Sequence, residues 1–331
     1  MSQEWTRDDL LLLGRGFMVP RILLTAVELD LFTKLKGKAL SVSELCATEG
    51  WDSRGLTILM DALAAEGLLS RGSDEKYSLP GSIAKYLVRD EEDSILPMIL
   101  HGCHLWESWS NLTRIVSTGE NLYPAERKTR PKEETEAFIQ AMHVVGQLVA
   151  PMIADSLDLS VYSKMLDVGG GPGTYAMAFL SKAPQMTATL FDLPEVVEIG
   201  RKRLTEAGLI DRVRIVVGDY TKDDLPPGHD LALLSAIIHS NSREANRNLF
   251  RNVYSSLVQG GTILVRDHIM DPTRTFPVAG AIFAVNMLAA TSVGNTYTFE
   301  EVKQDLESAG FKDVRMIREG QNMDQLVSAV K

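Results

Sequence analysis

The chain has 331 residues, of which 45% are hydrophobic and 24% are charged, and its formal net charge is −10. This size and balance are typical of one large globular domain or of two unequal ones. The acidic balance argues against general binding to nucleic acid or to an anionic membrane, because both depend on basic surface. We therefore expect a small molecule as the ligand.

The two cysteines, Cys46 and Cys103, belong to no CxxC or Cys/His cluster. The sequence thus predicts neither a disulfide framework nor a metal site. The first residues, MSQEWTRDDLLLLGRGF, carry acids where a signal peptide carries bases, and their apolar run is too short to cross a bilayer. We expect a cytoplasmic protein with no membrane attachment. A later apolar stretch, residues 278–293, is expected to form a buried helix.

The first hundred residues predict helices and one hairpin. In SVSELCATEGWDSRGLTILMDALAAEGLLSR, two helical patterns follow one another, with Ser43 and Ser53 as expected N-caps and Gly67 at the end of the second. The stretch GLLSRGSDEKYSLPG has two short apolar runs around residues 72–76, which indicates a β-hairpin. Two helices followed by a hairpin are typical of a winged helix.

A winged helix raises the alternative of a ligand-sensing regulator that binds DNA, because such folds place their second helix in the major groove. Here that helix offers Arg54 but also Asp61 and Glu66. With so few cations to meet phosphates, a scaffold for packing or dimerisation is favoured.

Residues 94–160 are predicted to be helical and include Trp106, Trp109, Phe138 and a charged loop at residues 123–134. The hydrophobic pattern then changes. From residue 164, apolar runs alternate with helix-length segments: KMLDVGG, TATLFDLP, RVRIVVGDY, DLALLSAII and GTILVRDHI. This alternation predicts parallel strands in a doubly wound α/β sheet, followed by one more helix and two closing strands. We divide the chain into residues 1–100, 101–160 and 161–331.

The loop in MLDVGGGPGTYA follows the first of these strands, where open α/β sheets bind their ligands. Gly169 and Gly171 lack Cβ atoms and let the backbone approach a ligand closely. The GK[ST] ending of a phosphate loop is absent, and Pro172 removes an amide donor from the GxGxG run. Asp167 at the entrance would repel a pyrophosphate and attract a cationic amino acid. A nicotinamide-dependent oxidoreductase is therefore disfavoured.

Two further acids end the next two predicted strands. Asp192, followed by Leu193, can bind both hydroxyls of a ribose, and Asp219 can accept from an adenine amino group while Tyr220 covers the ring. Together with the glycine loop they describe a pocket for ribose, adenine and an amino-acid end. S-adenosylmethionine has these three parts.

The motifs LDVGGGPGTYA, FDLPEVVE, RVRIVVGDY and GGTILVRD resemble, in order and spacing, those of the class I S-adenosylmethionine-dependent small-molecule O-methyltransferases. The resemblance covers nearly the whole chain. It implies a Rossmann-like methyltransferase sheet behind a winged-helix dimerisation domain, and a homodimer. It further implies that Gly169 and Gly171 line the methionine part of the cofactor. Ser235, also expected near the cofactor, stands where relatives often have a lysine.

The resemblance places the general base at His239, in LLSAIIHSN, and a bracing acid at Asp267, in LVRDHIM. A phenol titrates near pH 10, so a base that works near neutrality is needed to take its proton. Ser240 and Asn241 follow His239 instead of the family's Asp-Trp, and the position of a second bracing acid falls on Thr296. A C-methyltransferase, or altered chemistry on a polycyclic or tetrapyrrole-like substrate, is therefore kept as an alternative to O-methylation.

The acceptor is expected to be a hydroxylated aromatic or polycyclic small molecule. Met142 and Met287 fall where the family holds a planar ring between thioethers. The full set of expected wall residues is Trp106, Phe138, Met142, Phe283, Asn286 and Met287. Plain core packing is the alternative for each of them.

Overall fold

The structure is a computed structural model that describes residues 4–120 and 132–331. The chain forms two compact units, Met1–His104 and Leu105–Lys331. Helix α7 (Leu96–Ser110) crosses the boundary between them. Most of the charged loop expected at residues 123–134 lies outside the described residues.

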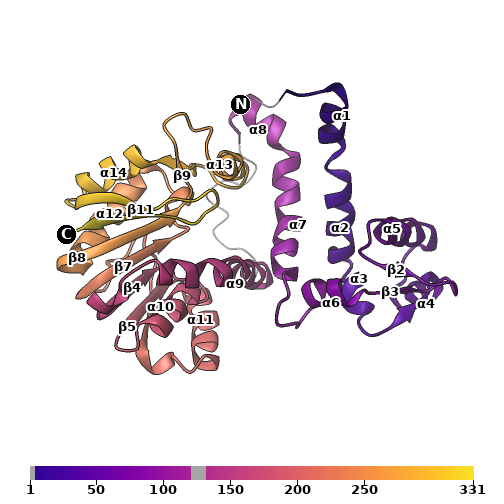
Figure 1. Cartoon of the computed structure of the whole chain (residues 1–331), viewed down its shortest axis with the longest axis horizontal. Helices are drawn as coiled ribbons and strands as arrows, with labels where there is room; N and C mark the ends of the chain where they lie inside the picture. The colour runs from indigo at the N-terminus through magenta and orange to yellow at the C-terminus, as the bar shows by residue number, and fades with distance from the viewer. Residues whose placement is uncertain (1–3, 121–131) are drawn as a thin grey trace. The chain divides into compact units, whose positions relative to one another are not determined.

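The N-terminal unit consists of helices and one small sheet (Figure 1). The three strands are antiparallel in the order β1-β3-β2, and β2 and β3 form the predicted hairpin. The elements are α1 (Arg7–Arg15), α2 (Met18–Glu28), α3 (Leu31–Lys34), β1 (Ala39–Leu40), α4 (Val42–Glu49), α5 (Ser53–Ala65), β2 (Ser70–Arg71), β3 (Tyr77–Ser78) and α6 (Gly81–Leu87).

The N-caps of α4 and α5 are not the predicted serines. Ser41 caps α4 in a capping box, in which its side chain accepts from the Glu44 N–H and the Glu44 carboxylate accepts from the Ser41 N–H. Asp52 caps α5 by accepting from the Gly55 N–H at 2.7 Å. The prediction of Ser43 and Ser53 was wrong because both lie already inside their helices. A capping box places its acid three residues after the cap, which singles out Ser41.

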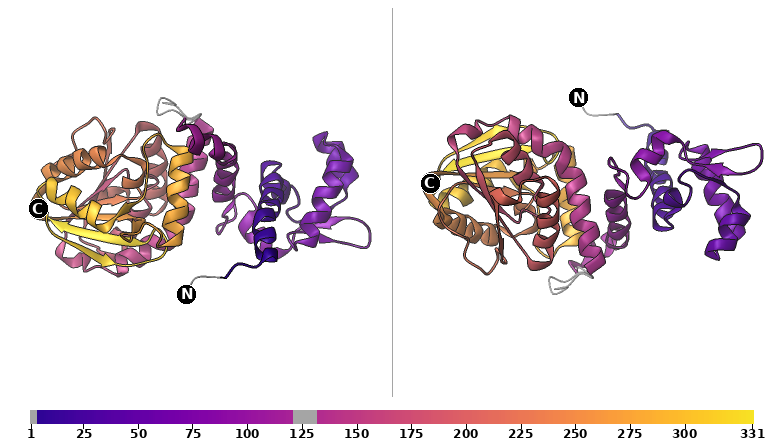
Figure 2. Two further views of the ribbon diagram at one scale, coloured as in Figure 1. Left: turned by 90° about the horizontal axis from the view of Figure 1, so that it is seen from above. Right: turned by 90° about the horizontal axis from the view of Figure 1, so that it is seen from below.

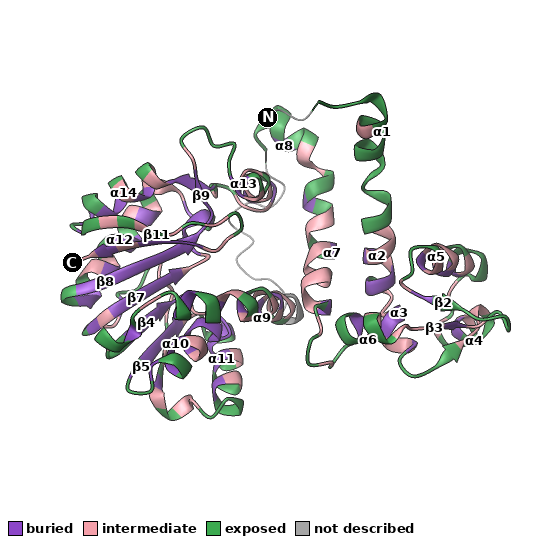
Figure 3. Cartoon of the chain, in the orientation of Figure 1, coloured by how far each residue is buried: buried purple, intermediate pink, exposed green. Residues whose placement is uncertain are grey.

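Apolar residues near the N-terminus are more exposed than those of α5. Leu56, Met60 and Leu63 of α5 are buried, whereas α1 buries none of its residues. Figure 3 shows α1 as mostly exposed, whereas α2 becomes buried toward its end. By length and composition alone, Arg7–Glu28 and Thr135–Asp155 are long and apolar enough to cross a membrane. The first of these extends beyond the short N-terminal apolar run on which the expectation of no membrane span was based. The second stretch contributes Ile153 to the core of its unit.

The second unit contains a seven-stranded sheet in the order β11-β12-β8-β7-β4-β5-β6. The strands β4 to β8 pair in parallel, as predicted, and the two closing strands are antiparallel. The strands are β4 (Lys164–Val168), β5 (Thr187–Asp192), β6 (Val213–Val217), β7 (His229–Ser235), β8 (Leu257–Asp267), β11 (Lys312–Arg318) and β12 (Gln325–Val330). A separate short pair joins β9 (Ile269–Met270) to β10 (Tyr297–Thr298).

Helices cover both faces of this sheet, as the two views of Figure 2 show. One core packs below α9 and α10 and includes Phe179 and Leu264, and the other packs below α12 and α14 and includes Phe250 and Val265. The helices are α8 (Leu112–Thr118), α9 (Lys132–Asp155), α10 (Thr174–Lys182), α11 (Pro194–Glu206), α12 (Arg243–Ser256), α13 (Val278–Ala290) and α14 (Phe299–Ser308). The carboxyl ends of β4 to β8 therefore meet at one edge of a fully covered sheet.

Helix α13 is not the buried helix that its composition suggested. It buries Gly280, Met287 and Ala289, but Val278 is 63% exposed and Ile282 is 57% exposed. The helix packs beside β9, the 3-10 turn at Ile238–Ser240 and α8, and these neighbours leave part of its surface exposed. A uniformly apolar sequence does not reveal which face is covered.

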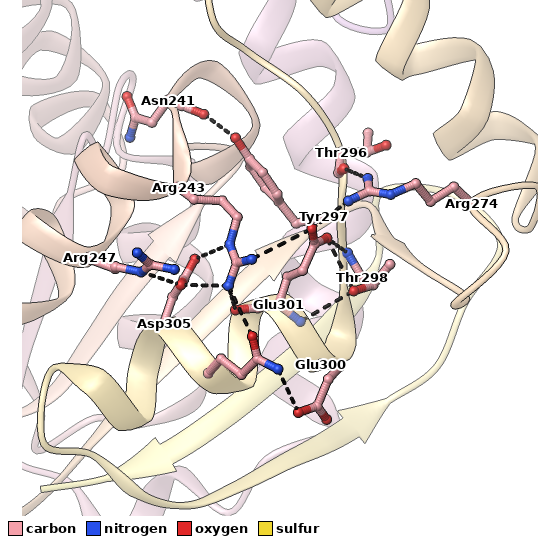
Figure 4. Close-up of polar contacts among 11 residues, drawn as sticks. Asn241, Arg243, Arg247, Arg274, Thr296, Tyr297, Thr298, Glu300, Glu301 and Asp305 are labelled. Atoms are coloured by element: carbon pink, nitrogen blue, oxygen red, sulfur yellow. Dashed lines mark hydrogen bonds and ion pairs between the residues drawn. The ribbon is translucent and has the colours of Figure 1, made fainter.

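Ion pairs tie α12 to α14 next to the carboxyl edge of the sheet (Figure 4). Asp305, which is 3% exposed, accepts from Arg243 Nη2 at 2.8 Å and from Arg247 Nε at 2.6 Å. Arg274 donates to Glu301 at 2.5 Å and to the Thr296 carbonyl at 2.8 Å. These contacts hold the start of α12 and the residues before α14 in place.

Replacing Asp305 by Asn should lower the free energy of unfolding by about 2 kcal/mol, because charge-assisted hydrogen bonds to two arginines are lost from a buried carboxylate. Urea unfolding measures the change. The matched control is Glu307→Gln on the same helix, where an exposed carboxylate lies 4.0 Å from Lys303. That variant should change stability by less than about 0.5 kcal/mol. Equal effects of the two variants would contradict this role for Asp305.

Candidate active site

The glycine loop after β4 packs against the protein on one side and leaves space on the other. A Cβ on Gly170 would lie 2.3 Å from Leu190 Cδ1 and 2.7 Å from the Asp167 carboxyl carbon. Gly171 has φ +56°, and a Cβ there would meet nothing within 4 Å. Side chains are thus excluded at Gly170 by the protein's own atoms, and the backbone at Gly171 stays open to a ligand.

Asp167 lies below this loop, with 1% of its surface exposed. Its Oδ2 atom is buried and has no hydrogen-bond partner. Burial, and then the charge of Asp192, raise the pKa of Asp167 to about 7. A buried acid with a free oxygen suits a cationic group of a ligand, because a nearby positive charge would favour its ionised form.

Asp192 at the end of β5 is held against the same loop. Its Oδ2 accepts from the Gly171 N–H at 2.7 Å, and its Oδ1 accepts from the Leu193 N–H at 2.7 Å. Each oxygen keeps a further lone pair, which is what recognition of two neighbouring hydroxyls requires. Burial is the main cause that raises the pKa of Asp192.

Asp219, beyond the end of β6, already has partners for both oxygens. Oδ1 accepts from the Thr221 N–H at 2.9 Å, and Oδ2 pairs with Lys222 Nζ at 2.5 Å. Burial pushes the pKa of Asp219 upward, but the hydrogen bonds from Lys222 and Thr221 outweigh it and lower the pKa. Tyr220 lies beside Gly169, where an added Cβ would be 3.7 Å from its ring. The structure therefore places Tyr220 beside the loop, and Lys222 engages the carboxylate of the neighbouring Asp219.

His239 and Asp267 meet beyond the ends of β7 and β8. His239 Nδ1 lies 2.9 Å and 3.0 Å from the two carboxylate oxygens of Asp267, and both residues are buried. Burial acts to raise the pKa of Asp267, but His239 and the hydrogen bonds to the carboxylate lower it. A carboxylate at Nδ1 favours the tautomer with a proton there, which leaves Nε2 as the basic nitrogen.

The chain reaches His239 through an unusual backbone conformation. Ala236, directly after β7, has φ 59°. A non-glycine residue in the left-handed region costs on the order of 1 kcal/mol, and such strain is concentrated at functional sites. The turn it produces leads into the 3-10 segment that carries His239.

The expected acceptor walls lie on three helices of the second unit. Phe283 on α13 contacts the His239 ring edge-on, with the ring centroids 4.8 Å apart. Asn286 accepts from Trp109 Nε1 at 2.9 Å, and Met287 is 6% exposed. The other expected residues are half-buried and lie on α7 and α9: Trp106, Phe138 and Met142. The structure thus brings Phe283 to the candidate base.

Thr296 is buried and lies on the segment that covers His239. Its carbonyl accepts from Arg274, and the neighbouring Asn295 N–H donates to the His239 carbonyl at 2.9 Å. The carboxylate that hydrogen-bonds the His239 ring is that of Asp267. That Thr296 replaces a second acid stays a prediction.

Two further polar residues lie at this edge that were not predicted from the sequence as site residues. His268 is buried, its ring centroid lies 4.9 Å from that of Phe283, and burial lowers its pKa to about 4. Arg266 is 3% exposed, and its Nη1 donates to Ser235 Oγ at 3.1 Å. The signal for Arg266 was available, because it is a charge inside the apolar run GTILVRDHI.

Within residues 4–120 and 132–331, the structure holds no group of three or more His, Cys, Asp or Glu side chains that could bind a metal ion.

Replacing Asp167 by Asn should change how stability depends on pH. The native pKa of about 7 exceeds the ordinary value of 3.8, so the folded state binds this proton more tightly than the unfolded state does. The wild type should therefore lose stability relative to Asp167→Asn as pH rises from about 4 to 7, by up to about 4 kcal/mol at about 1.36 kcal/mol per unit. Urea unfolding across this range measures the difference.

The control for that experiment is Asp158→Asn, at an exposed cap whose hydrogen bonds from Ser160 lower its pKa. For this control the pH dependence of the stability difference has the opposite sign. The wild type gains stability relative to Asp158→Asn as pH rises through the acid range, because the pKa of Asp158 is lowered in the folded state. A stability difference for Asp167→Asn that stays constant with pH would contradict the buried, protonated carboxyl.

Family models match most of the chain. Residues 113–312 match an O-methyltransferase domain, and residues 11–89 match an O-methyltransferase dimerisation domain. The chain is 33% identical to the tetracenomycin polyketide synthesis 8-O-methyl transferase of Streptomyces glaucescens, over 93% of this chain and 92% of that protein. It is 31% identical to acetylserotonin O-methyltransferase of Bos taurus, over 95% of both.

A solved structure has the same fold. Human N-acetylserotonin methyltransferase in complex with SAM superposes with a TM-score of 0.85 at 28% identity, over 100% of this chain and 99% of that one. The unpartnered oxygen of Asp167 and the open backbone at Gly171 fit a ligand with a cationic end. The chain belongs to the O-methyltransferase family and is an S-adenosylmethionine-dependent methyltransferase.

Proposed function

We propose that this enzyme methylates a hydroxyl group of an aromatic or polycyclic small molecule, with His239 as the general base. The observation that carries the proposal is the buried contact between His239 and Asp267 at the carboxyl edge of the sheet. The names of similar proteins support the substrate class, since they act on a tetracenomycin polyketide, a 3-hydroxy-naphthoate and acetylserotonin.

The proton of the acceptor hydroxyl passes to His239 Nε2 in this proposal. Asp267 accepts the hydrogen bond from Nδ1–H, fixes the ring and stabilises the imidazolium that forms. Burial of both residues strengthens this electrostatic support, because the local dielectric constant is low. Phe283, edge-on to the imidazole, limits the directions from which an acceptor can approach Nε2.

Bound S-adenosylmethionine supplies an electrophilic methyl group on a sulfonium. The chain's part is to hold its two ends. Asp192, fixed by the Gly171 and Leu193 amides, accepts from the ribose hydroxyls, and Asp219 with Tyr220 holds the adenine. Gly169 and Gly171 line the methionine part, and Ser235 lies at the end of the neighbouring strand. Alignment of the reacting groups then accounts for much of the catalysis.

The acceptor would lie against α13 and α9. Phe283 and Met287 of α13 offer an aromatic edge and a thioether to a planar ring, and Asn286 is oriented by Trp109. Trp106, Phe138 and Met142 form the remaining wall in this proposal. A wall of aromatic and thioether side chains favours a flat, aromatic acceptor.

The matched dimerisation domain supports a homodimer of this chain. We place the enzyme in the cytoplasm with small molecules as its ligands. The acidic net charge of −10 disfavours nucleic acid and anionic membranes as partners.

Replacing His239 by Ala should lower kcat by about 10²-fold or more, because general base catalysis is lost. Methyl transfer from labelled S-adenosylmethionine to a panel of hydroxynaphthoates and hydroxyindoles provides the assay. Binding of S-adenosylhomocysteine should be unchanged. The matched control is His229→Asn, a buried histidine at the opposite end of β7 that contacts Thr189. An undiminished kcat in His239→Ala would rule out the base.

Replacing Asp192 by Ala should weaken binding of S-adenosylhomocysteine by about 100-fold, since two charge-assisted hydrogen bonds to the ribose are lost. Isothermal titration calorimetry measures the dissociation constant. Asp211→Ala, in the exposed turn before β6, removes the same charge and should leave binding unchanged. Similar affinities of the wild type and Asp192→Ala would show that the nucleoside is held elsewhere.

A further inference from the structure

Three strand ends place polar side chains on one face of the sheet. Ser235 is the last residue of β7, and Asp167 and Arg266 each lie one position before the end of their strands, β4 and β8. Side chains alternate along a strand, and each of these residues follows by two positions a member of the core below α9 and α10, namely Met165, Leu233 and Leu264. Ser235 and Arg266 are also direct neighbours in the parallel register of β7 and β8.

Tyr175 of α10 packs against this face of the sheet. The Arg266 guanidinium carbon lies 5.2 Å from the centre of the Tyr175 ring, in a cation–π contact. Burial raises the pKa of the Tyr175 hydroxyl, the charge of Arg266 and the nearby Ser235 side chain lower it, and Asp167 raises it. The cation, the carboxyl and the hydroxyl therefore belong to one cluster.

The cluster contains polar atoms that the protein leaves without partners. Arg266 Nε, Tyr175 Oη and Asp167 Oδ2 are all buried and form no hydrogen bond. Among the described residues, Arg266 also has no ion pair within 4.0 Å, although 97% of its surface is covered (3% exposed). Buried polar groups without partners are costly, and they are rare unless a ligand or a catalytic role accounts for them.

When ionised, Arg266 and Asp167 carry opposite charges, and both act electrostatically on the Tyr175 hydroxyl. An anionic ligand would satisfy Arg266 but be repelled by Asp167, and a cationic ligand would do the reverse. A ligand that carries an ammonium and a carboxylate on one carbon satisfies both. The amino-acid end of S-adenosylmethionine and of S-adenosylhomocysteine has this chemistry.

We propose that Arg266, together with the hydroxyls of Ser235 and Tyr175, binds the carboxylate of the cofactor's amino-acid end, while Asp167 binds its ammonium group. The proposal rests on the cofactor site proposed above and adds a carboxylate subsite on β7, β8 and α10. The guanidinium fork offers further N–H donors beside the one that bonds Ser235. Arg266 would thereby distinguish the complete cofactor from nucleosides that lack the carboxylate.

The test compares three ligands by isothermal titration calorimetry: S-adenosylhomocysteine, its decarboxylated analogue, and 5′-methylthioadenosine, which lacks the whole amino-acid end. The wild type should bind S-adenosylhomocysteine about 10- to 100-fold more tightly than the decarboxylated analogue, the range expected for charge-assisted hydrogen bonds. In Arg266→Met this preference should disappear, while the affinity for 5′-methylthioadenosine stays within about 2-fold. Arg251→Met, an exposed arginine on α12, is the matched control.

Tyr175→Phe provides a second variant that keeps the ring below the guanidinium. It removes a hydroxyl that has no partner in the free protein, so the melting temperature should not fall, yet S-adenosylhomocysteine should bind about 3- to 10-fold more weakly. Equal affinity of the wild type for S-adenosylhomocysteine and the decarboxylated analogue overturns the subsite without reference to any variant. Equal weakening of all three ligands in Arg266→Met also overturns it. Failure of the wild type to bind S-adenosylhomocysteine at all would instead overturn the cofactor site.

Discussion

The alternation of side chains at the end of β8 is the constraint on which the rest of the site depends. Asp267 points to one face of the sheet and hydrogen-bonds His239, and Arg266, directly before it, points to the other face and meets Ser235 and Tyr175. Adjacent residues thus serve the proton-accepting side and the proposed cofactor side. A slip of one residue against β7 would exchange them, so the register is as important to function as the residues themselves.

The carboxyl edge of the sheet combines several features that oppose folding. Asp167 and Arg266 are buried ionisable groups with unpartnered atoms, and Ala236 is held in a left-handed conformation. Two well-packed cores and the ion pairs of Asp305 with α12 lie beside this edge and offset the cost. Local departures of this kind, inside an otherwise consistent structure, are typical of functional sites because a ligand supplies the missing partners.

Much of this arrangement could be predicted from single strands, and the remainder depends on pairing between distant segments. Buried parallel strands read as apolar runs, so the acids at their ends, such as Asp192, stand out in the sequence. The contact of His239 with Asp267 was expected from the resemblance and is present in the structure. Arg266 lies beside Ser235 because of the register between β7 and β8. The two residues are 31 positions apart in the chain, so no local sequence pattern predicts that they meet. The partial exposure of α13 and the pairing of Asp219 with Lys222 likewise depend on three-dimensional neighbours.

The most direct measurement is a crystal structure of the enzyme with S-adenosylhomocysteine bound. The account predicts the ribose hydroxyls on Asp192, the ammonium group within hydrogen-bond distance of Asp167 Oδ2, and the sulfur on the side of the loop from which His239 Nε2 can be reached by an acceptor. A nucleoside bound away from the glycine loop, or bound there with its amino-acid end turned away from Asp167, would contradict it.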